Sequence, residues 1–202
     1  MDAPPAVREK VGWWAPTSSQ WAVRAELAVK AIFDLINQMQ AAGTIGRYAI
    51  GGAVGATFYL EPSATLDVDI FVTLPMGPSQ ALLSLAPLYA FLLSRGGTME
   101  GEHIVIDGWP VQFLPAADAL DQEALAEAIE TEVEGVRTWV MPAEHLAAIA
   151  LRTGRPKDHN RVLQFLEQNS LDEARLQGIL QRHGLTTKWE RFQDKYLGDA
   201  HE

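Results

Sequence analysis

The stretch that decides the fold reads Tyr48-Ala49-Ile50-Gly51-Gly52, followed 15 residues later by Asp67-Val68-Asp69. Residues 47–50 predict a short strand, and the apolar residues 53–60 after the glycine pair predict a helix. Residues 66–74 alternate and are rich in Val, Ile and Phe, which is typical of a second strand. The sequence therefore predicts a strand–helix–strand unit with glycines at its first turn.

Asp67 and Asp69 stand two residues apart on the second of these strands, so their carboxylates project from the same face. Two adjacent like charges raise each other's pKa unless a cation lies between them. A divalent ion with oxygen ligands, Mg²⁺ or Mn²⁺, resolves this repulsion, and Mg²⁺ needs only one or two carboxylates plus substrate phosphates. Gly51 and Gly52 let backbone N–H groups approach phosphate oxygens. The pattern predicts a site for metal and phosphate.

The remaining elements follow from periodicity, turn residues and capping signals. Strands are predicted over 104–106, 111–114 and 132–140; helices are predicted from 18 or 19 to 40 and over 53–60, 78–94, 119–129, 144–152, 157–168 and 186–196, with one more starting at a capping box formed by Ser170 and Glu173. The expected fold class is α+β, a small mixed β-sheet flanked by helices and followed by a helical C-terminal part.

Three regions are expected along the chain. Residues 1–45 hold an N-terminal helix that packs on the core, residues 46–140 form the α/β core, and residues 141–202 form the helical C-terminal region. Their charges differ, because residues 41–151 carry three basic and 14 acidic side chains, whereas residues 152–202 carry nine basic and eight acidic ones. An anion bound by residues 41–151 must therefore be neutralised by a metal ion, by backbone amides or by the C-terminal segment, whose first cations are Arg152, Arg155 and Lys157.

Composition excludes several classes of function. The chain has 202 residues, 48% of them hydrophobic, which suits a globular domain. The absence of cysteine excludes disulfides, thiolate zinc sites and cysteine nucleophiles. A net charge of −10 argues against generic DNA binding. The longest apolar stretch, 82–93, is too short to cross a bilayer, and with no targeting segment the expected location is cytoplasmic, with no membrane contact.

Ile50-Gly51-Gly52 and Thr65-Leu66-Asp67-Val68-Asp69-Ile70 resemble the paired glycine and Asp-x-Asp signature of the polymerase-beta-type nucleotidyltransferase superfamily. Within this superfamily, the two motifs most resemble a small bacterial branch related to AbiEii-like toxins. The match covers residues 46–72 and extends loosely to Arg155-Pro156-Lys157-Asp158, which is similar to a helix start in that branch.

The resemblance implies a role for each matching position. Asp67 and Asp69 would be catalytic and bind Mg²⁺ or Mn²⁺. The residues that would bind the nucleoside triphosphate are Gly51, Gly52, Thr65, Arg155 and Lys157. The fold implied is a mixed sheet with a helical C-terminal part that closes over the nucleotide.

Two positions depart from the family pattern. Relatives often have Arg where this chain has Ser63. The third carboxylate of the family falls on Gln112, whose amide can be a metal ligand but cannot act as a base near neutral pH. Three alternatives follow. Either Asp107 or Glu102 replaces the missing acid, or the enzyme is slow, or the protein only binds nucleotide.

The leading hypothesis is a metal-dependent nucleotidyltransferase that moves a nucleoside monophosphate from a nucleoside triphosphate to an acceptor hydroxyl on a small molecule, a protein or an RNA end. The alternative is a catalytically weak or inactive nucleotide-binding module, a toxin-like component with an antitoxin-like protein partner. The histidines show no metal-ligand spacing and are expected in surface or packing roles. They are His103, His145, His159, His183 and His201.

Overall fold

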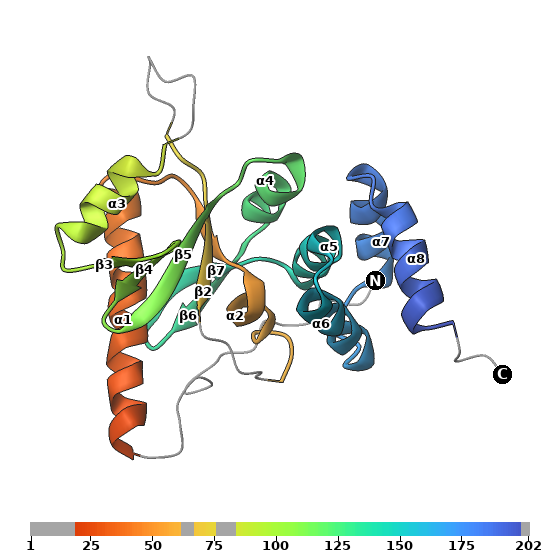
Figure 1. Cartoon of the computed structure of the whole chain (residues 1–202), viewed down its shortest axis with the longest axis horizontal. Helices are drawn as coiled ribbons and strands as arrows, with labels where there is room; N and C mark the ends of the chain where they lie inside the picture. The colour runs from red at the N-terminus through yellow and green to blue at the C-terminus, as the bar shows by residue number, and fades with distance from the viewer. Residues whose placement is uncertain (1–18, 62–66, 76–83, 199–202) are drawn as a thin grey trace.

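The computed structural model describes residues 19–61, 67–75 and 84–198, with only the helical backbone described over 19–28. Seven strands form one sheet in the order β3-β4-β5-β2-β1-β7-β6 (Figure 1). The strands are β1 (Tyr48–Ile50), β2 (Val68–Val72), β3 (Thr98–Glu100), β4 (His103–Ile106), β5 (Trp109–Pro115), β6 (Ile129–Val133) and β7 (Val136–Val140). The pairs β1/β7 and β2/β5 are parallel and the others antiparallel, so the sheet is mixed.

β2 lies in the middle of the sheet, between β5 and β1. Val68, Ile70 and Val72 are buried in the core on one face. Asp69 and Phe71 face the other way, because successive residues of a strand alternate between faces. One strand therefore serves the core with one face and an open cleft with the other.

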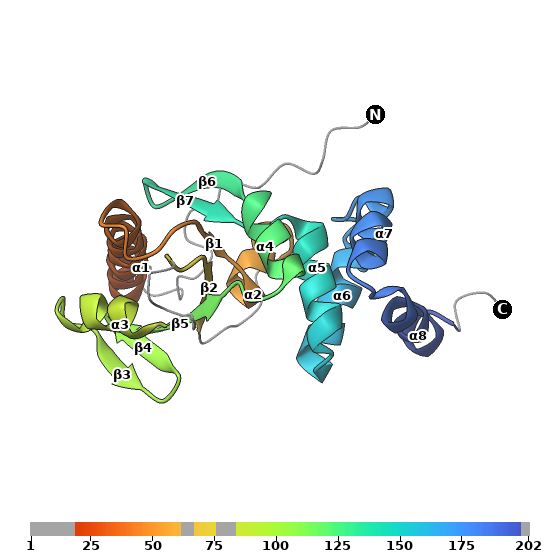
Figure 2. The same ribbon diagram turned by 90° about the horizontal axis from the view of Figure 1, so that it is seen from above.

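Helices cover both faces of the sheet. The helices are α1 (Ser19–Ala41), α2 (Gly52–Ala56), α3 (Ala86–Leu93), α4 (Ala119–Ala126), α5 (Ala143–Thr153), α6 (Pro156–Glu167), α7 (Glu173–Arg182) and α8 (Thr186–Tyr196). Figure 2 shows α1 and α3 on one side of the sheet, with α2, α4 and the C-terminal helices α5–α8 on the other. The expected fold class is confirmed: a mixed sheet between helices, followed by a helical C-terminal part.

The C-terminal helices have a core that is continuous with that of the sheet. Phe165 and Ile179 are fully buried, and Trp189 stacks on Phe192 with ring centroids 5.6 Å apart. The Ser170 hydroxyl donates to the Tyr59 carbonyl oxygen at 3.2 Å, and this bond fastens the region to the segment that follows α2. The division into three regions stays a prediction, and residues from all three regions belong to one hydrophobic core.

Several element boundaries differ from the sequence predictions. The helix predicted over 119–129 ends at Ala126, and the strand predicted over 132–140 is a hairpin of β6 and β7 that turns at Glu134 and Gly135, both with positive φ. β3 was not expected, because Thr98–Glu100 is exposed and has no alternating pattern. The N-cap of α7 is Asp172, whose carboxylate accepts the Arg175 N–H.

Two further differences concern helices near the site. The helix after the glycine pair is only five residues long and continues as turns. The predicted helix 78–94 begins outside the described residues, which resume at 84 and become helical at Ala86. In the part of the chain that the structure describes, no helix combines the length and the apolar character needed to span a bilayer.

Candidate active site

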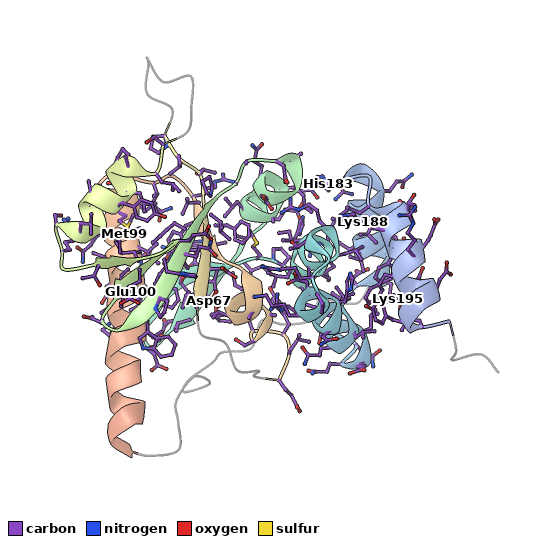
Figure 3. All side chains as sticks on the ribbon, viewed as in Figure 1. Asp67, Met99, Glu100, His183, Lys188 and Lys195 are labelled. Atoms are coloured by element: carbon purple, nitrogen blue, oxygen red, sulfur yellow. The ribbon has the colours of Figure 1, made fainter. Side chains whose placement is uncertain are left out.

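A cleft of about 1140 Å³ lies between the exposed face of the sheet and the C-terminal helices α5 and α6. Its sheet side carries Asp67, Asp69 and Gln112, and its helix side carries cationic residues of α6. Asp67 lies where β2 begins, on the side of the sheet that faces these helices (Figure 3). The cleft thus brings together residues that are separated by about half of the chain.

Asp69 is held against the backbone of the glycine turn. The Gly51 N–H donates to the Asp69 carbonyl oxygen at 2.9 Å, which extends the β1–β2 ladder by one step. Gly52 has a φ of +56°, and a Cβ added there would lie 1.8 Å from the Asp69 Oδ2 atom. A Cβ on Gly51 would lie 2.5 Å from the Phe71 ring. Both glycines are therefore needed because they leave room for β2, in addition to any contact with phosphate.

The environment of Asp69 disfavours its negative charge. Burial, and then the neighbouring carboxylate of Asp67, raise the pKa of Asp69 to about 6. Arg161, Lys157 and Arg155 oppose this rise in pKa through their positive charges. A divalent cation between the two carboxylates would remove the repulsion that the arginines and the lysine only reduce.

Gln112 stands directly beside Asp69. The two residues are Cα partners in the parallel β2–β5 ladder, and both line the cleft. The neighbours Val111 and Phe113 are buried in the core on the opposite face. The Gln112 side chain therefore faces the cleft beside Asp69.

The cationic side of the cleft is organised by a buried acid at the start of α6. Asp158 accepts hydrogen bonds from the Arg155 Nε at 2.6 Å and Nη2 at 3.2 Å, and the Arg161 Nη1 lies 3.5 Å from its Oδ1. Lys157 is exposed between them and lines the cleft. Asp158 neutralises part of this charge, but its main effect is to hold two guanidinium groups beside the carboxylate pair.

The other predicted residues have varied placements. Thr65 lies outside the described residues. Arg152 lines the cleft, but it is paired with the carboxylates of Asp118 and Asp121, so it braces α4 against α5. Arg161 was not selected from the sequence, although it is four residues after Lys157 and a helix places such residues on one face.

Glu102 and Asp107, the predicted replacements for the missing acid, both lie in hairpin turns. Neither is among the described residues that line the cleft. Glu100 and His103 line it instead, on β3 and β4. The His103 Nε2 lies 3.6 Å from the Asp67 Oδ2, so the expectation of a surface or packing role does not describe this histidine. Only the register of β4 against β5, which the sequence leaves open, brings His103 there.

These residues fit a divalent cation together with a polyphosphate. The carboxylates of Asp67 and Asp69 and the amide oxygen of Gln112 are oxygen ligands of the kind that Mg²⁺ prefers. The space beside Gly52, which a Cβ would fill, lets Asp69 stay at the wall of the cleft. The cations at the start of α6 line the same cleft, and their positive charges act on Asp69.

A second group of potential ligands lies apart from this cleft. Glu123, Glu127 and His145 place ligand atoms within 4.8 Å of one another. Glu123 already accepts hydrogen bonds from the Arg182 guanidinium at 2.6 Å and contacts the His183 Nε2 at 2.8 Å. Arginine and histidine bonding lowers the pKa of Glu123 to about 2. This group joins α4 to α5 and α7 as an ion-pair network.

No family model matches the chain, and no curated protein matches it. Among solved structures, the chain is similar to the solution structure of the antibiotic-resistance factor ANT(2″)-Ia, with 16% identity, a TM-score of 0.45 and coverage of 86% of this chain and 99% of that one. It is also similar to the crystal structure of ANT(2″)-Ia with adenylyl-2″-tobramycin, with 16% identity, a TM-score of 0.49 and coverage of 82% and 98%. It is similar as well to the crystal structure of an antigenic nucleotidyltransferase-like protein from Paracoccidioides brasiliensis. The identity is 15%, the TM-score is 0.46, and the match covers 87% of this chain and 95% of that one.

The close approach of Gly52 to Asp69 generates a first prediction. Gly52→Ala should weaken binding of Mn²⁺ at least about tenfold, because the new methyl group displaces the Asp69 carboxylate. Gly101→Ala is the matched control, since Gly101 has a similar φ of +62° and open space around its Cβ position. The Gly101→Ala variant should lose only about 1 kcal/mol of unfolding free energy, because alanine is strained at a positive φ. Calorimetric titration and urea unfolding measure both effects, and equal Mn²⁺ affinities in the two variants would contradict the expectation.

The raised pKa of Asp69 generates a second prediction. Because the folded pKa is about 6 and the ordinary value is 3.8, stability contributed by the protonated acid is present below pH 3.8 and is lost as the pH rises through 6. The unfolding free energy of Asp69→Asn at pH 8, in EDTA, should therefore exceed that of the wild type by about 3 kcal/mol. The excess should shrink toward pH 4. An Asp69→Asn protein that is several kcal/mol less stable at pH 8 would make the carboxylate structural.

Proposed function

We propose that this protein is a metal-dependent nucleotidyltransferase that moves a nucleoside monophosphate from a nucleoside triphosphate to an acceptor hydroxyl. One observation carries the proposal: a half-buried carboxylate pair on β2 faces three cations of α6 across one cleft. A site with both signs of charge suits a ligand that is itself a cation bound to a polyanion. Metal–nucleoside triphosphate complexes have this composition.

The residues divide the binding between them. Asp67 and Asp69, with the amide oxygen of Gln112, would hold Mg²⁺ or Mn²⁺. Such an ion, when bound, polarises the phosphate and steadies the charge that develops on the leaving group. Lys157 and Arg161 lie at spacing i and i+4 on α6, and they would contact the β- and γ-phosphates as positively charged donors.

The glycine turn would contact the phosphates through the backbone. The first N–H groups of α2, those of Gly52 and Ala53, have no partner within the helix and point toward its N-terminal side. The Gly51 N–H is used by the β1–β2 ladder, so the contribution of Gly51 is the space it leaves for Phe71. Arg155, which Asp158 holds in a two-point hydrogen bond, completes the phosphate side.

In the proposed reaction, the acceptor oxygen forms a bond to the α-phosphorus and the bond from that phosphorus to the β-phosphate bridging oxygen breaks. Pyrophosphate leaves, and the acceptor proton passes to a base. Gln112 cannot receive this proton, because a neutral amide is not basic near pH 7. The cleft therefore supports binding and orientation of the triphosphate more completely than it supports activation of the acceptor.

This gap favours a second candidate function, a catalytically weak or silent nucleotide-binding module. The observation behind it is the pairing of Gln112 with Asp69 in the ladder, which puts an amide where a third acid would complete the site. The resemblance to AbiEii-like toxins, noted for the sequence, adds a toxin-like role with an antitoxin-like partner to this second candidate. Co-purification of the chain with the product of a neighbouring gene would support that version.

Binding of metal and triphosphate together tests the shared part of both candidates. An NTP with Mg²⁺ or Mn²⁺ should raise the melting temperature, and either alone should do little, because each neutralises the charge of the other in the cleft. Lys157→Ala should weaken triphosphate binding about tenfold and monophosphate binding much less, since one charge-assisted contact is worth about 1.5 kcal/mol. Lys195→Ala, on α8 outside the cleft, should match the wild type. A metal-independent shift that sulfate reproduces would refute the proposal.

Replacement of Gln112 by aspartate separates enzyme from binder. Gln112→Asp adds a third carboxylate beside Asp69, which should tighten Mn²⁺ binding and supply the missing base. Transfer of label from each radiolabelled NTP into cell-extract acceptors should rise at least about tenfold if the wild type lacks only this base. Gln164→Asp, at another position lining the cleft but on α6, controls for added charge alone. Unchanged metal affinity with a large loss of stability would mean that position 112 does not face the ion.

A further inference from the structure

A row of polar side chains crosses four neighbouring strands on the cleft face of the sheet. Asp69 pairs with Gln112 across β2 and β5. The antiparallel register of β4 and β5, continued by one residue beyond Ile104 and Val111, places His103 opposite Gln112. His103 in turn pairs with Glu100 across β3 and β4. Directly opposed residues share a face, so the four side chains point into the cleft together. All four line it. The polar face of the cleft therefore extends beyond the Asp-x-Asp motif to β4 and β3.

His103 approaches the motif at a distance that suits a shared ion. Its Nε2 lies 3.6 Å from the Asp67 Oδ2, which is longer than a good hydrogen bond. Two ligand atoms about 2.1 Å from one tetrahedral ion lie about 3.4 Å apart. The two side chains are about one-third exposed, 32% for His103 and 34% for Asp67, so water and ions reach the gap between them.

We propose that His103 and Asp67 together bind a divalent transition-metal ion, and that His103 gives this cleft a preference for ions that accept imidazole, such as Co²⁺ and Zn²⁺, over Mg²⁺. The inference rests on the proposed function only in taking Asp67 as a metal ligand. Imidazole nitrogen suits Zn²⁺ and its neighbours in the first transition row, whereas Mg²⁺ prefers oxygen ligands alone. Asp69 and Gln112 line the same cleft and offer further oxygen atoms there.

The Glu123, Glu127 and His145 group does not meet the same conditions. His145 is fully buried, its Nε2 lies 3.2 Å from Glu123, and its Nδ1 has no hydrogen-bond partner among the described residues. If Nε2 bound an ion, the ring proton would move to Nδ1 and become a buried donor without an acceptor, which costs free energy. Arg175 and Arg182 also already pair with the two carboxylates. That network therefore serves as an internal control.

Direct metal titration of the full chain tests the proposal, with Co²⁺ followed by its visible absorption and Mg²⁺ by calorimetry. His103→Ala should weaken Co²⁺ binding at least about tenfold and Mg²⁺ binding less than about threefold. His103→Gln, which offers an amide oxygen, should bind Mg²⁺ as the wild type does and should lack the preference for Co²⁺. Glu123→Gln should leave both affinities unchanged. Circular dichroism of each variant verifies the fold.

The outcomes separate this proposal from the proposed function. If Asp67→Asn weakens binding of both ions while His103→Ala changes the two affinities equally or not at all, the role of His103 is refuted and the carboxylate site stands. If Asp67→Asn changes neither affinity, the metal site of the proposed function fails as well. A loss of Co²⁺ binding in Glu123→Gln would assign the ion to the α4–α7 network instead.

Discussion

The structure depends on the close approach of β2 to the glycine turn that precedes it in sequence. The Asp69 carboxylate lies where a side chain at position 52 would be, and the Phe71 ring lies where one at position 51 would be. A side chain at position 51 or 52 would overlap Phe71 or Asp69, so β2 could not then keep its observed register against β1. The rest of the site is arranged around a strand whose position this contact fixes.

The opposite charges on the two sides of the cleft are held in place by different interactions. On the sheet, burial keeps a carboxylate pair at a cost that a cation would relieve. On α6, the buried Asp158 holds Arg155 and Arg161 near each other although their charges repel. Each group of charges is positioned by contacts on its own side of the cleft, the carboxylates against the glycine turn and the guanidinium groups on Asp158. The electrostatic field between them is therefore present before any ligand arrives.

Much of this arrangement follows from the sequence, and the exceptions have physical causes. The alternation around Asp67 and the glycine pair predicted the central strand–helix–strand unit, because both signals are local. The sequence also indicated that cations must come from the segment that begins at Arg152, since residues 41–151 hold only three. His103 and Arg161 were missed because their places depend on strand register and helix docking, which are tertiary. β3 was missed because a short, exposed strand has little hydrophobic pattern.

The location of the two charged walls has a consequence for how such a protein can change. The acidic wall of the cleft lies within residues 67–112, and the basic wall lies within residues 155–161. Both walls are built on one hydrophobic core, so a substitution in that core can disturb both of them. A substitution of a side chain that faces the cleft instead alters one charge without repacking the core. Selection can therefore change the charges of the two walls separately by acting on the residues that face solvent.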